Sequence, residues 1–312
     1  MPTVRGDIKV VAYITAYEDW EAVDRCLYAI QKQTFQVTHI LIVDNSSKNL
    51  IPTRFNLLEE ITVQSFPENI GISGGLKVAV EWFKKSNYDF LWTFDQDSEP
   101  EPDCLEKLIF DYNQLISQNI PVGVIAPLPI DNNTQMEICG RNFENYHLVS
   151  ASNHKGDLYE CDVVITSGSL IPIKAAQSVE LPNGELFIDA VDWEYCINFK
   201  TKGYKIFVSK KAILKHQFSD LVKVKIPLLG ANILINNYSP LRQYYICRNH
   251  TYFIIKNTSN NYLLLSFLSR IYYALRVIFK VAFYEPDQKL QKISACLLGT
   301  FDGFRGKLGK TW

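Results

Sequence analysis

The first half of the chain alternates short, continuous apolar runs with longer segments whose apolar residues recur at helical spacing. The continuous runs predict buried strands and the spaced segments predict helices. The strands are predicted at residues 8–15, 38–45, 61–66, 88–95 and 122–127, and the helices at residues 21–33, 75–86 and 104–118. Strands that are apolar on both faces and alternate with helices are typical of an α/β fold, with a mainly parallel sheet covered on both sides.

The second half of the chain has a more mixed pattern. Residues 158–173 predict a strand, a turn and a second strand, and residues 187–218 predict a loop, a helix and two short strands. From about residue 236 the spacing is helical, with many aromatic and basic residues. We therefore expect one α/β domain over residues 1–235 and a helical region over residues 236–312.

Charge and cysteine content argue against a nucleic-acid-binding protein, a disulfide-rich protein and a zinc-site protein. The chain has 32 basic and 33 acidic residues, a balance that predicts neither a nucleic acid nor a strongly acidic partner. Its seven cysteines form no CxxC pair, which favours reduced thiols in a cytosolic protein over a disulfide framework or a zinc site. Cys104 and Cys196 are expected to be packing residues. The N-terminal residues lack the apolar run of a signal peptide.

Residues 262–283 form the most apolar long segment of the chain. They include Arg270, Arg276 and Lys280, which a membrane-spanning helix would rarely tolerate, so no clean transmembrane helix is expected. We expect these three cations to lie roughly on one side of a helix. Such a helix suits either the surface of an anionic membrane or packing against the domain with a solvated basic face.

Polar residues follow the predicted strands at three places: Thr15-Ala16-Tyr17, Asp44-Asn45-Ser46 and Asp95-Gln96-Asp97. In parallel sheets, ligands bind beyond the carboxyl ends of the strands. Asp95 and Asp97 lie two residues apart, so on an extended segment both can face one cation. Carboxylate oxygens at such a place suit Mg²⁺ or Mn²⁺. The alternative is an acidic surface turn, because the residues SEPEPD follow directly.

Asp44 ends the second predicted strand. A carboxylate in this position can accept a hydrogen bond from a nucleobase N–H or a ribose hydroxyl. It can also close an Asx turn with the residues that follow it. The two interpretations are compatible.

The segment ENIGISGGLKVAV, residues 68–80, is rich in glycine and leads into a helix. It lacks the Gly-Lys-Ser/Thr sequence of a Walker loop and the G-x-G-x-x-G spacing of dinucleotide-binding folds. We therefore expect a tight turn that lets the backbone approach a ligand or a neighbouring strand.

Acidic residues also cluster in FIDAVDWEYC, which contains Asp189, Asp192 and Glu194. A carboxylate beside an aromatic ring at the start of a helix can serve as a general base. It can equally be a first-turn charge that favours the helix, and this is expected for one of the three. His216 follows a short predicted strand and becomes a candidate ligand beside a carboxylate pair that needs more metal donors.

These segments, in this order, resemble the inverting family-2 glycosyltransferases of the GT-A fold over most of the chain. AYITAYED resembles the opening strand and nucleotide-binding loop, LIVDNSS the VDNxS segment, ENIGISGG the Asn-x-Gly-rich turn, FDQDS the Asp-x-Asp metal motif, and VDWEYC the later acidic motif that carries the base. SPLRQYYICRN (239–249), DGFRGKLGK (302–310) and FIDAVDWEYC resemble the bacterial rhamnosyltransferase branch in particular. One departure is GGLKVAV, where relatives often carry Asn after the glycines, so no ligand contact is assigned to Leu76 and Lys77.

The resemblance implies a GT-A domain with a nucleotide-binding half over residues 1–127, an acceptor half over residues 128–235, and a helical C-terminal region that associates with membranes. It implies that Mg²⁺ or Mn²⁺ is held by Asp95, Asp97 and His216. It makes Asp192 the catalytic base and places Trp193 and Glu194 near the acceptor. The nucleotide-binding residues that it implies are Thr15, Ala16, Tyr17, Asp44, Asn69, Gly74 and Asp95.

The implied activity is an inverting sugar transfer, with L-rhamnose moving from dTDP-L-rhamnose to a bacterial cell-surface polysaccharide or lipid-linked glycan. Such an enzyme is expected in the cytoplasm, peripheral on the inner face of the cell membrane, and is compatible with an oligomer. The alternatives are another nucleotide sugar, such as a UDP-hexose or UDP-N-acetylhexosamine, or a non-catalytic nucleotide-sugar-binding scaffold. A nucleotidyltransferase would open with a glycine-rich basic loop, whereas TAYEDW is acidic and free of glycine.

Overall fold

The computed structural model describes residues 8–48, 59–151, 156–217, 221–225 and 232–312. Residues 1–7, on which the signal-peptide prediction partly depends, lie outside this set. Contacts group the chain into two compact units. Unit 1 comprises Met1–Asn142, Ser150–Gly184 and Asp192–Gln217, and unit 2 comprises Phe143–Val149, Glu185–Val191 and Phe218–Trp312. The domain boundary at residue 235 stays a prediction.

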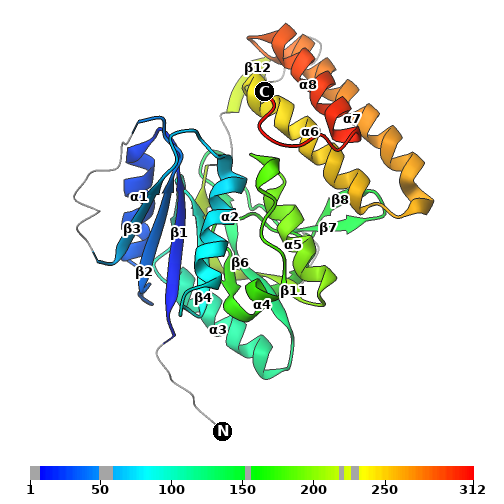
Figure 1. Cartoon of the computed structure of the whole chain (residues 1–312). Coiled ribbons are helices and arrows are strands. Elements are labelled where there is room, and N and C mark those ends of the chain that lie inside the picture. Colours follow the sequence, from blue (N-terminus) through cyan, green and yellow to red (C-terminus); the bar gives the residue numbers. More distant parts are fainter. Residues whose placement is uncertain (1–7, 49–58, 152–155, 218–220, 226–231) are drawn as a thin grey trace. The chain divides into compact units, whose positions relative to one another are not determined.

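Unit 1 is built on a mixed sheet in which the strands lie in the order β3-β2-β1-β4-β10-β6-β11-β5, with β9 paired to β11. Figure 1 shows β3, β2 and β1 side by side. The parallel neighbours are β1 (Val10–Ala16), β2 (His39–Asp44), β3 (Ile61–Ser65) and β4 (Phe90–Asp95), and separately β6 (Val122–Asp131) and β11 (Lys205–His216). The antiparallel strands are β10 (Leu170–Pro172), β5 (Ser98–Pro100) and β9 (Leu158–Cys161). The predicted mostly parallel sheet is confirmed.

Helices cover both faces of this sheet because its central strands are apolar on both sides (Figure 1). Alternate residues of β1, beginning with Val10, share a core cluster with α1 (Trp20–Gln31) and α3 (Cys104–Ser117). The opposite face, which includes Tyr13, packs against α2 (Gly71–Lys84). A Cβ atom added to Gly75 of α2 would lie only 2.7 Å from Tyr13 Oη, so glycine is needed for this close approach. The helices α4 (Ile173–Ser178) and α5 (Val191–Thr201) follow later in the chain.

Two predicted elements differ from the structure. The helix α2 begins at Gly71, earlier than the predicted residue 75, because its glycines lie inside the first turns rather than in a preceding loop. The strand β11 is continuous over Lys205–His216, where two short strands were predicted. Its pairing with β6 shifts register between Ser209 and Ile213, which accounts for the polar break in its sequence pattern.

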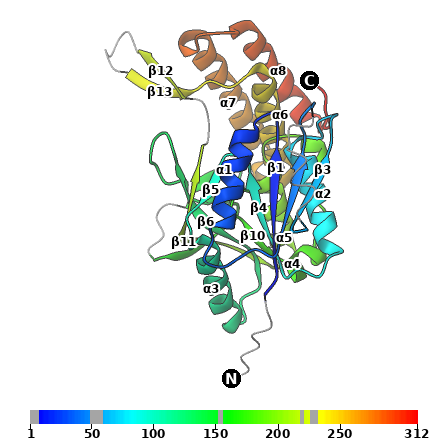
Figure 2. The same ribbon diagram turned by 90° about the vertical axis from the view of Figure 1, so that its left-hand side faces the viewer.

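Unit 2 contains the C-terminal helices α6 (Pro240–Asn257), α7 (Leu263–Tyr284) and α8 (Lys289–Phe304), which Figure 2 shows with the β12–β13 pair. The strands β12 (Leu221–Lys225) and β13 (Asn232–Asn236) are antiparallel. The strands β7 (Arg141–Glu144) and β8 (His147–Ser150) form a separate two-stranded sheet (Figure 1). Short 3₁₀ turns lie at Gly184–Leu186 and Asn260–Tyr262. The helical region predicted after residue 236 is confirmed.

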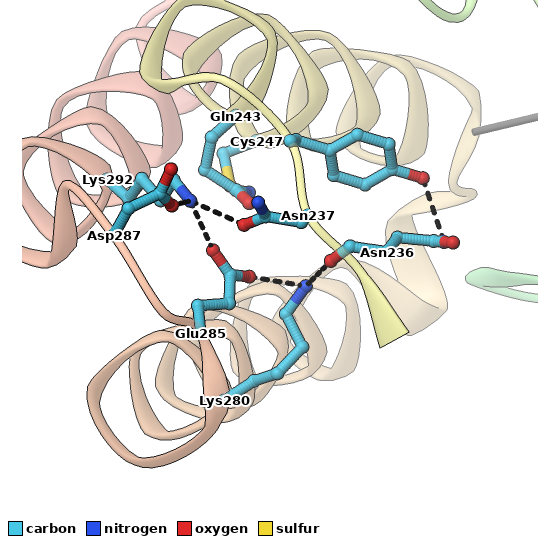
Figure 3. Close-up of polar contacts among 9 residues, drawn as sticks. Asn236, Asn237, Gln243, Cys247, Lys280, Glu285, Asp287 and Lys292 are labelled. Atoms are coloured by element: carbon cyan, nitrogen blue, oxygen red, sulfur yellow. Dashed lines mark hydrogen bonds and ion pairs between the residues drawn. The ribbon is translucent and has the colours of Figure 1, made fainter. Parts of the chain in front are cut away.

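The three cations of α7 do not share one side of the helix, so that prediction is wrong. Arg270 is buried over the ring of Tyr273, at 4.2 Å from its centroid, whereas Arg276 is exposed. Lys280 is 2.8 Å from Glu285 Oε1, and the other oxygen of Glu285 is 2.9 Å from Lys292 Nζ (Figure 3). Residues six apart in a helix point about 120° away from each other, so Arg270 and Arg276 do not form one stripe.

Candidate active site

The carboxyl ends of β1, β2 and β4 meet at one edge of the sheet in unit 1. Thr15 lies opposite Asp95 of β4, and Ala16 lies opposite Asp44 of β2. These four residues, all predicted to bind nucleotide, are therefore neighbours across three adjacent strands. Ala16 and Asp44 also line a shallow depression together with Tyr17, Ser46 and residues at the start of α1.

Asp44 has one carboxylate oxygen bound and one without a partner. Its Oδ1 accepts a hydrogen bond from the Ser46 backbone N–H at 2.9 Å, which is the predicted Asx turn. Its Oδ2 is buried, and no hydrogen bond to it is found among the residues that the structure describes. A buried carboxylate oxygen without a donor is unfavourable, so Oδ2 is suited to a donor on a ligand.

The loops that follow β1 and β2 are tied to each other and to the Asp-x-Asp segment. The Tyr17 N–H donates to Gln96 Oε1 at 2.6 Å, and Gln96 Nε2 donates back to the Tyr17 carbonyl oxygen at 3.1 Å. The Glu18 N–H donates to Ser46 Oγ at 2.8 Å. The Tyr17 side chain is half exposed. Gln96 and Asp97 form a turn between Asp95 and Ser98, so the extended segment predicted for Asp95 and Asp97 is not present. No role was predicted for Gln96.

The glycine-rich turn before α2 is organised by asparagine side chains. Asn69 has a positive φ of 52°, and its Oδ1 accepts from the Gly71 N–H at 2.9 Å. Asn45 Oδ1 accepts from the Ile70 N–H at 3.2 Å. A Cβ atom added to Gly74 would lie 2.8 Å from Ile70 Cβ, so glycine permits tight local packing there. The predicted nucleotide contacts of Asn69 and Gly74 stay predictions.

Asp95, Asp97 and His216 come together as a potential cation site. Each offers one ligand atom, and these atoms all lie within 4.8 Å of one another. His216 reaches the other two because β11 pairs with β5, which places it opposite Ser98. Its Nδ1 lies 2.9 Å from Ser98 Oγ and 3.4 Å from Asp97 Oδ1.

The environment of Asp95 also fits a bound cation. Ser167 Oγ donates to Asp95 Oδ2 at 2.8 Å and accepts from the Asp95 backbone N–H at 2.9 Å, which fixes the carboxylate. Asp95 Oδ1 is buried and has no hydrogen-bond partner in the described part of the chain. Two carboxylates and an imidazole are suitable ligands for Mn²⁺ or Mg²⁺. The residues present therefore fit the predicted cation.

Asp192, Trp193 and Glu194 lie in the first turn of α5. Asp192 Oδ1 accepts a hydrogen bond from the Trp193 N–H at 3.0 Å, and the guanidinium of Arg141 lies 5.8 Å from the centre of the Trp193 ring. Glu194 is buried. These contacts do not test catalysis. The predicted roles of Asp192 as base and of Trp193 and Glu194 as acceptor-binding residues stay predictions.

Cys104 and Cys196 are buried in the interior, as predicted for packing residues. Burial raises the pKa of the Cys196 thiol to about 12 and raises the pKa of Cys104 further still, so neither is a thiolate at neutral pH. No cysteine nucleophile is therefore expected at these two positions.

The chain is similar in sequence to known glycosyltransferases. Residues 12–137 match the family described as Glycosyl transferase family 2. The chain is 24% identical over 280 residues to the dTDP-rhamnosyl transferase RfbF of Shigella flexneri, and the match covers 88% of each protein. It is 32% identical over 114 residues to a hyaluronan synthase of Streptococcus pyogenes, a match that covers 34% of this chain and 27% of the synthase.

Solved structures with the same fold are more distant in sequence. The crystal structure of GalNAc-T7 with UDP, GalNAc and Mn²⁺ has a TM-score of 0.60 and 14% identity, and the match covers 92% of this chain and 53% of GalNAc-T7. The structure of S. aureus TarS with UDP has a TM-score of 0.54 and 17% identity, covering 92% of this chain and 79% of that one. Residues 12–137 are thus similar to glycosyl transferase family 2, and the chain has the GT-A fold of the solved structures.

Proposed function

We propose that the chain transfers L-rhamnose from dTDP-L-rhamnose to a hydroxyl group of a bacterial cell-surface polysaccharide or lipid-linked glycan, with inversion at the anomeric carbon. The observation that carries the choice of donor is the match to the Shigella flexneri dTDP-rhamnosyl transferase, which covers 88% of both chains. The match to the hyaluronan synthase covers only 34% of this chain and supports the family alone.

In the proposed reaction, Asp192 accepts the proton of the acceptor hydroxyl while that oxygen attacks the anomeric carbon. The bond between this carbon and the diphosphate oxygen breaks, its electron pair stays with the oxygen, and dTDP leaves. A single displacement from the opposite side inverts the configuration and needs no nucleophile on the protein. Trp193 and Glu194, beside the base on α5, contact the acceptor sugar.

The nucleotide lies at the strand ends, where Asp44 Oδ2 accepts a hydrogen bond from the nucleoside. Asp95, Asp97 and His216 would hold Mg²⁺ or Mn²⁺, which would supply Lewis-acid assistance by neutralising charge on the departing diphosphate. The remaining residues assigned to the nucleotide are Thr15, Ala16, Tyr17, Asn69, Gly74 and Asp95.

The donor is tested with a panel of nucleotide sugars, each measured by thermal shift with and without Mn²⁺. At one hundred times its Kd, a ligand adds about 2.7 kcal/mol to the stability of the folded state, which corresponds to a rise in Tm of about 5–10 °C. We expect dTDP-L-rhamnose with Mn²⁺ to give the largest rise. A larger rise with UDP-glucose or UDP-N-acetylglucosamine would overturn the assignment of the donor.

A UDP-sugar is the second candidate donor, because both structural neighbours contain UDP. The thermal-shift panel separates it from dTDP-L-rhamnose directly. A nucleotide-sugar-binding scaffold is the third candidate. It is supported if a nucleotide sugar binds but no transfer to bacterial glycan acceptors is detected by mass spectrometry.

We further propose that α7 lies on the surface of an anionic membrane, which places the enzyme beside a lipid-linked acceptor on the cytoplasmic face. Its exposed apolar residues follow helical spacing along one side: Leu264, Leu268, Ile271, Leu275, Phe279 and Phe283. The helix contains no acidic residue, and the exposed Arg276 lies at the edge of this strip. A wide apolar strip with a basic residue at its edge is compatible with an interfacial helix.

Lying on the membrane suits α7 better than crossing it. By length and composition Asn260–Tyr284 could span a bilayer, and only 22% of its most apolar window is buried. However, its other side carries the buried Arg270 and Val281 and packs on α6 and α8. Near its end, Lys280 is held by Glu285. A spanning helix would have to place these groups in lipid, whereas an interfacial one leaves them in the protein.

Binding to membranes is measured by sedimentation of the full chain with vesicles of phosphatidylglycerol or of phosphatidylcholine. We expect binding to phosphatidylglycerol vesicles that weakens as salt is raised and is lost in Leu275→Glu, because a charge would enter the apolar strip. Leu241→Glu, at an exposed leucine of α6, is the control and should bind like the wild type. A salt-resistant dimer that Leu275→Glu dissociates, without vesicle binding by the wild type, would assign this strip to a second copy of the chain instead.

A further inference from the structure

The segment that precedes Asp192 has a strained backbone. Phe187, Asp189 and Ala190 have φ values of 65°, 65° and 62°, in the left-handed region that disfavours residues with a Cβ atom. Such conformations persist only where the surrounding structure determines them, and they concentrate at functional sites. The contacts that hold residues 185–190 are therefore of functional interest.

Asn249 of α6 holds this segment through its side-chain amide. The side chain is fully buried, and its Oδ1 accepts from Arg248 Nε at 2.8 Å, which fixes the orientation of the amide. Its Nδ2 then faces three backbone carbonyl oxygens, those of Leu186 at 2.8 Å, Ile188 at 2.6 Å and Asp189 at 3.1 Å. The Asn249 amide thus binds backbone carbonyl groups on both sides of Phe187, the first strained residue.

Arg248 binds the same segment from the neighbouring position. Its guanidinium is buried over the ring of Tyr245, 4.6 Å from the centroid. All five of its N–H groups have acceptors, which is the full donor capacity of arginine. Besides Asn249 Oδ1, these acceptors are the carbonyl oxygens of Glu185 (3.2 Å), Leu186 (3.0 Å) and Gly309 (2.6 Å) and Thr311 Oγ1 (3.2 Å).

The helix α8 supports α6 at this point. A Cβ atom added to Gly303 would lie 2.4 Å from the carbonyl oxygen of Arg248, so the two helices are in backbone contact there. The Gly309 N–H also donates to the Glu185 carbonyl oxygen at 2.8 Å. The segments 239–249 and 302–310 and the start of FIDAVDWEYC, which together resemble the rhamnosyltransferase branch, therefore converge on residues 185–190.

We propose that Arg248 and Asn249 are positioning residues for the catalytic base. This inference rests on the proposed role of Asp192 in proton transfer. The chain runs from Ala190 through Val191 directly into Asp192, so the backbone held by Arg248 and Asn249 determines where the first turn of α5 begins. A displacement of about 1 Å in a reacting group can cost about 10²-fold in rate.

The test is the isosteric variant Asn249→Asp, which replaces the NH₂ donor by an oxygen facing three carbonyl oxygens. We expect kcat for sugar transfer to fall by about 10–100-fold while the Kd of the nucleotide donor changes less than about two-fold. Hydrogen exchange of the amides in residues 185–192 should become faster. Asn257→Asp is the matched control: it lies on the same helix, its Nδ2 donates to the Phe253 carbonyl oxygen at 2.8 Å, and its kcat should remain that of the wild type.

A double-mutant cycle distinguishes positioning from a general effect on stability. In an Asp192→Asn background, Asn249→Asp should cause no further loss of kcat, because the group that it positions has been removed. An equal further loss, or a lower Tm with unchanged kcat, would overturn the inference. If Asn249→Asp does not fold, Asn249→Ser, which keeps one donor, is measured in the same way. Near-normal turnover of Asp192→Asn alone would instead identify a failure of the proposed function.

Discussion

Replacing Asp192 with asparagine should lower kcat for sugar transfer by about 10²–10⁴-fold, the usual contribution of a positioned acid–base group. Asparagine has the same shape as aspartate, and its carbonyl oxygen can still accept the hydrogen bond from the Trp193 N–H, now 3.0 Å from Asp192 Oδ1. The local structure of α5 should therefore persist, and only the ability to accept a proton is lost. Transfer is measured as an initial rate, and donor affinity by isothermal titration.

The titration should give the same donor Kd for Asp192→Asn as for the wild type, because Asp192 contacts the acceptor side in this mechanism. Glu21→Gln is the matched control, since Glu21 is an exposed carboxylate in the first turn of α1. It should retain the wild-type rate. Turnover of Asp192→Asn within a few-fold of the wild type would reject this residue as the base and direct attention to Glu194, the other carboxylate of the same turn.

The parts of the site that the sequence predicted are those marked by a local pattern. Asp44 and Asp95 each follow a continuous apolar run, and such runs end at the carboxyl edge of a parallel sheet. Their approach through β1 follows from adjacent parallel strands, and the register confirms it, with Ala16 opposite Asp44 and Thr15 opposite Asp95. Periodicity was therefore sufficient to place these residues at one edge of the sheet, whereas the strand order β2-β1-β4, which makes them neighbours, is seen only in the structure.

The parts that were missed depend on contacts between distant segments. Ser167 fixes Asp95 from 72 residues away, and nothing in its local sequence distinguishes it from a serine in a turn. Glu285 is buried between Lys280 and Lys292, so the lysine that had been assigned to a basic surface is neutralised inside unit 2 (Figure 3). Helical spacing describes directions around one helix, but it does not show which carboxylate a neighbouring segment supplies.

The fold explains why His216 could be proposed but not placed from sequence. It lies at the end of β11, and that strand reaches the Asp-x-Asp segment only because the short strand β5 turns back antiparallel to it. Three residues, Ser98–Pro100, make this pairing, and they read in sequence as an acidic turn. The alternative interpretation, an acidic surface turn, described the composition of this segment, but Ser98–Pro100 forms a strand that pairs with the sheet.

Replacing Asp97 with alanine should abolish the part of donor binding that depends on a divalent cation. Loss of a group that only orients a metal ligand costs about 10–100-fold in metal affinity, so loss of a ligand itself should cost about 100-fold or more. Titrations of dTDP with and without Mn²⁺ measure this effect. Without Mn²⁺ the variant should bind dTDP like the wild type, because Asp44 and the strand ends that contact the nucleoside are unchanged.

Mn²⁺ binding in the presence of dTDP, followed by electron paramagnetic resonance, separates a ligand role from an indirect one. Asp24→Ala removes an exposed carboxylate of α1 and should leave both titrations unchanged. Wild-type Mn²⁺ affinity in Asp97→Ala would show that Asp95 and His216 are sufficient, and the three-residue site would then be wrong in its composition. We expect Asp97→Ala to lose Mn²⁺ binding and to keep its metal-free binding of dTDP. Asp97 would then complete a cation site whose other ligands, Asp95 and His216, are already held by Ser167 and Ser98.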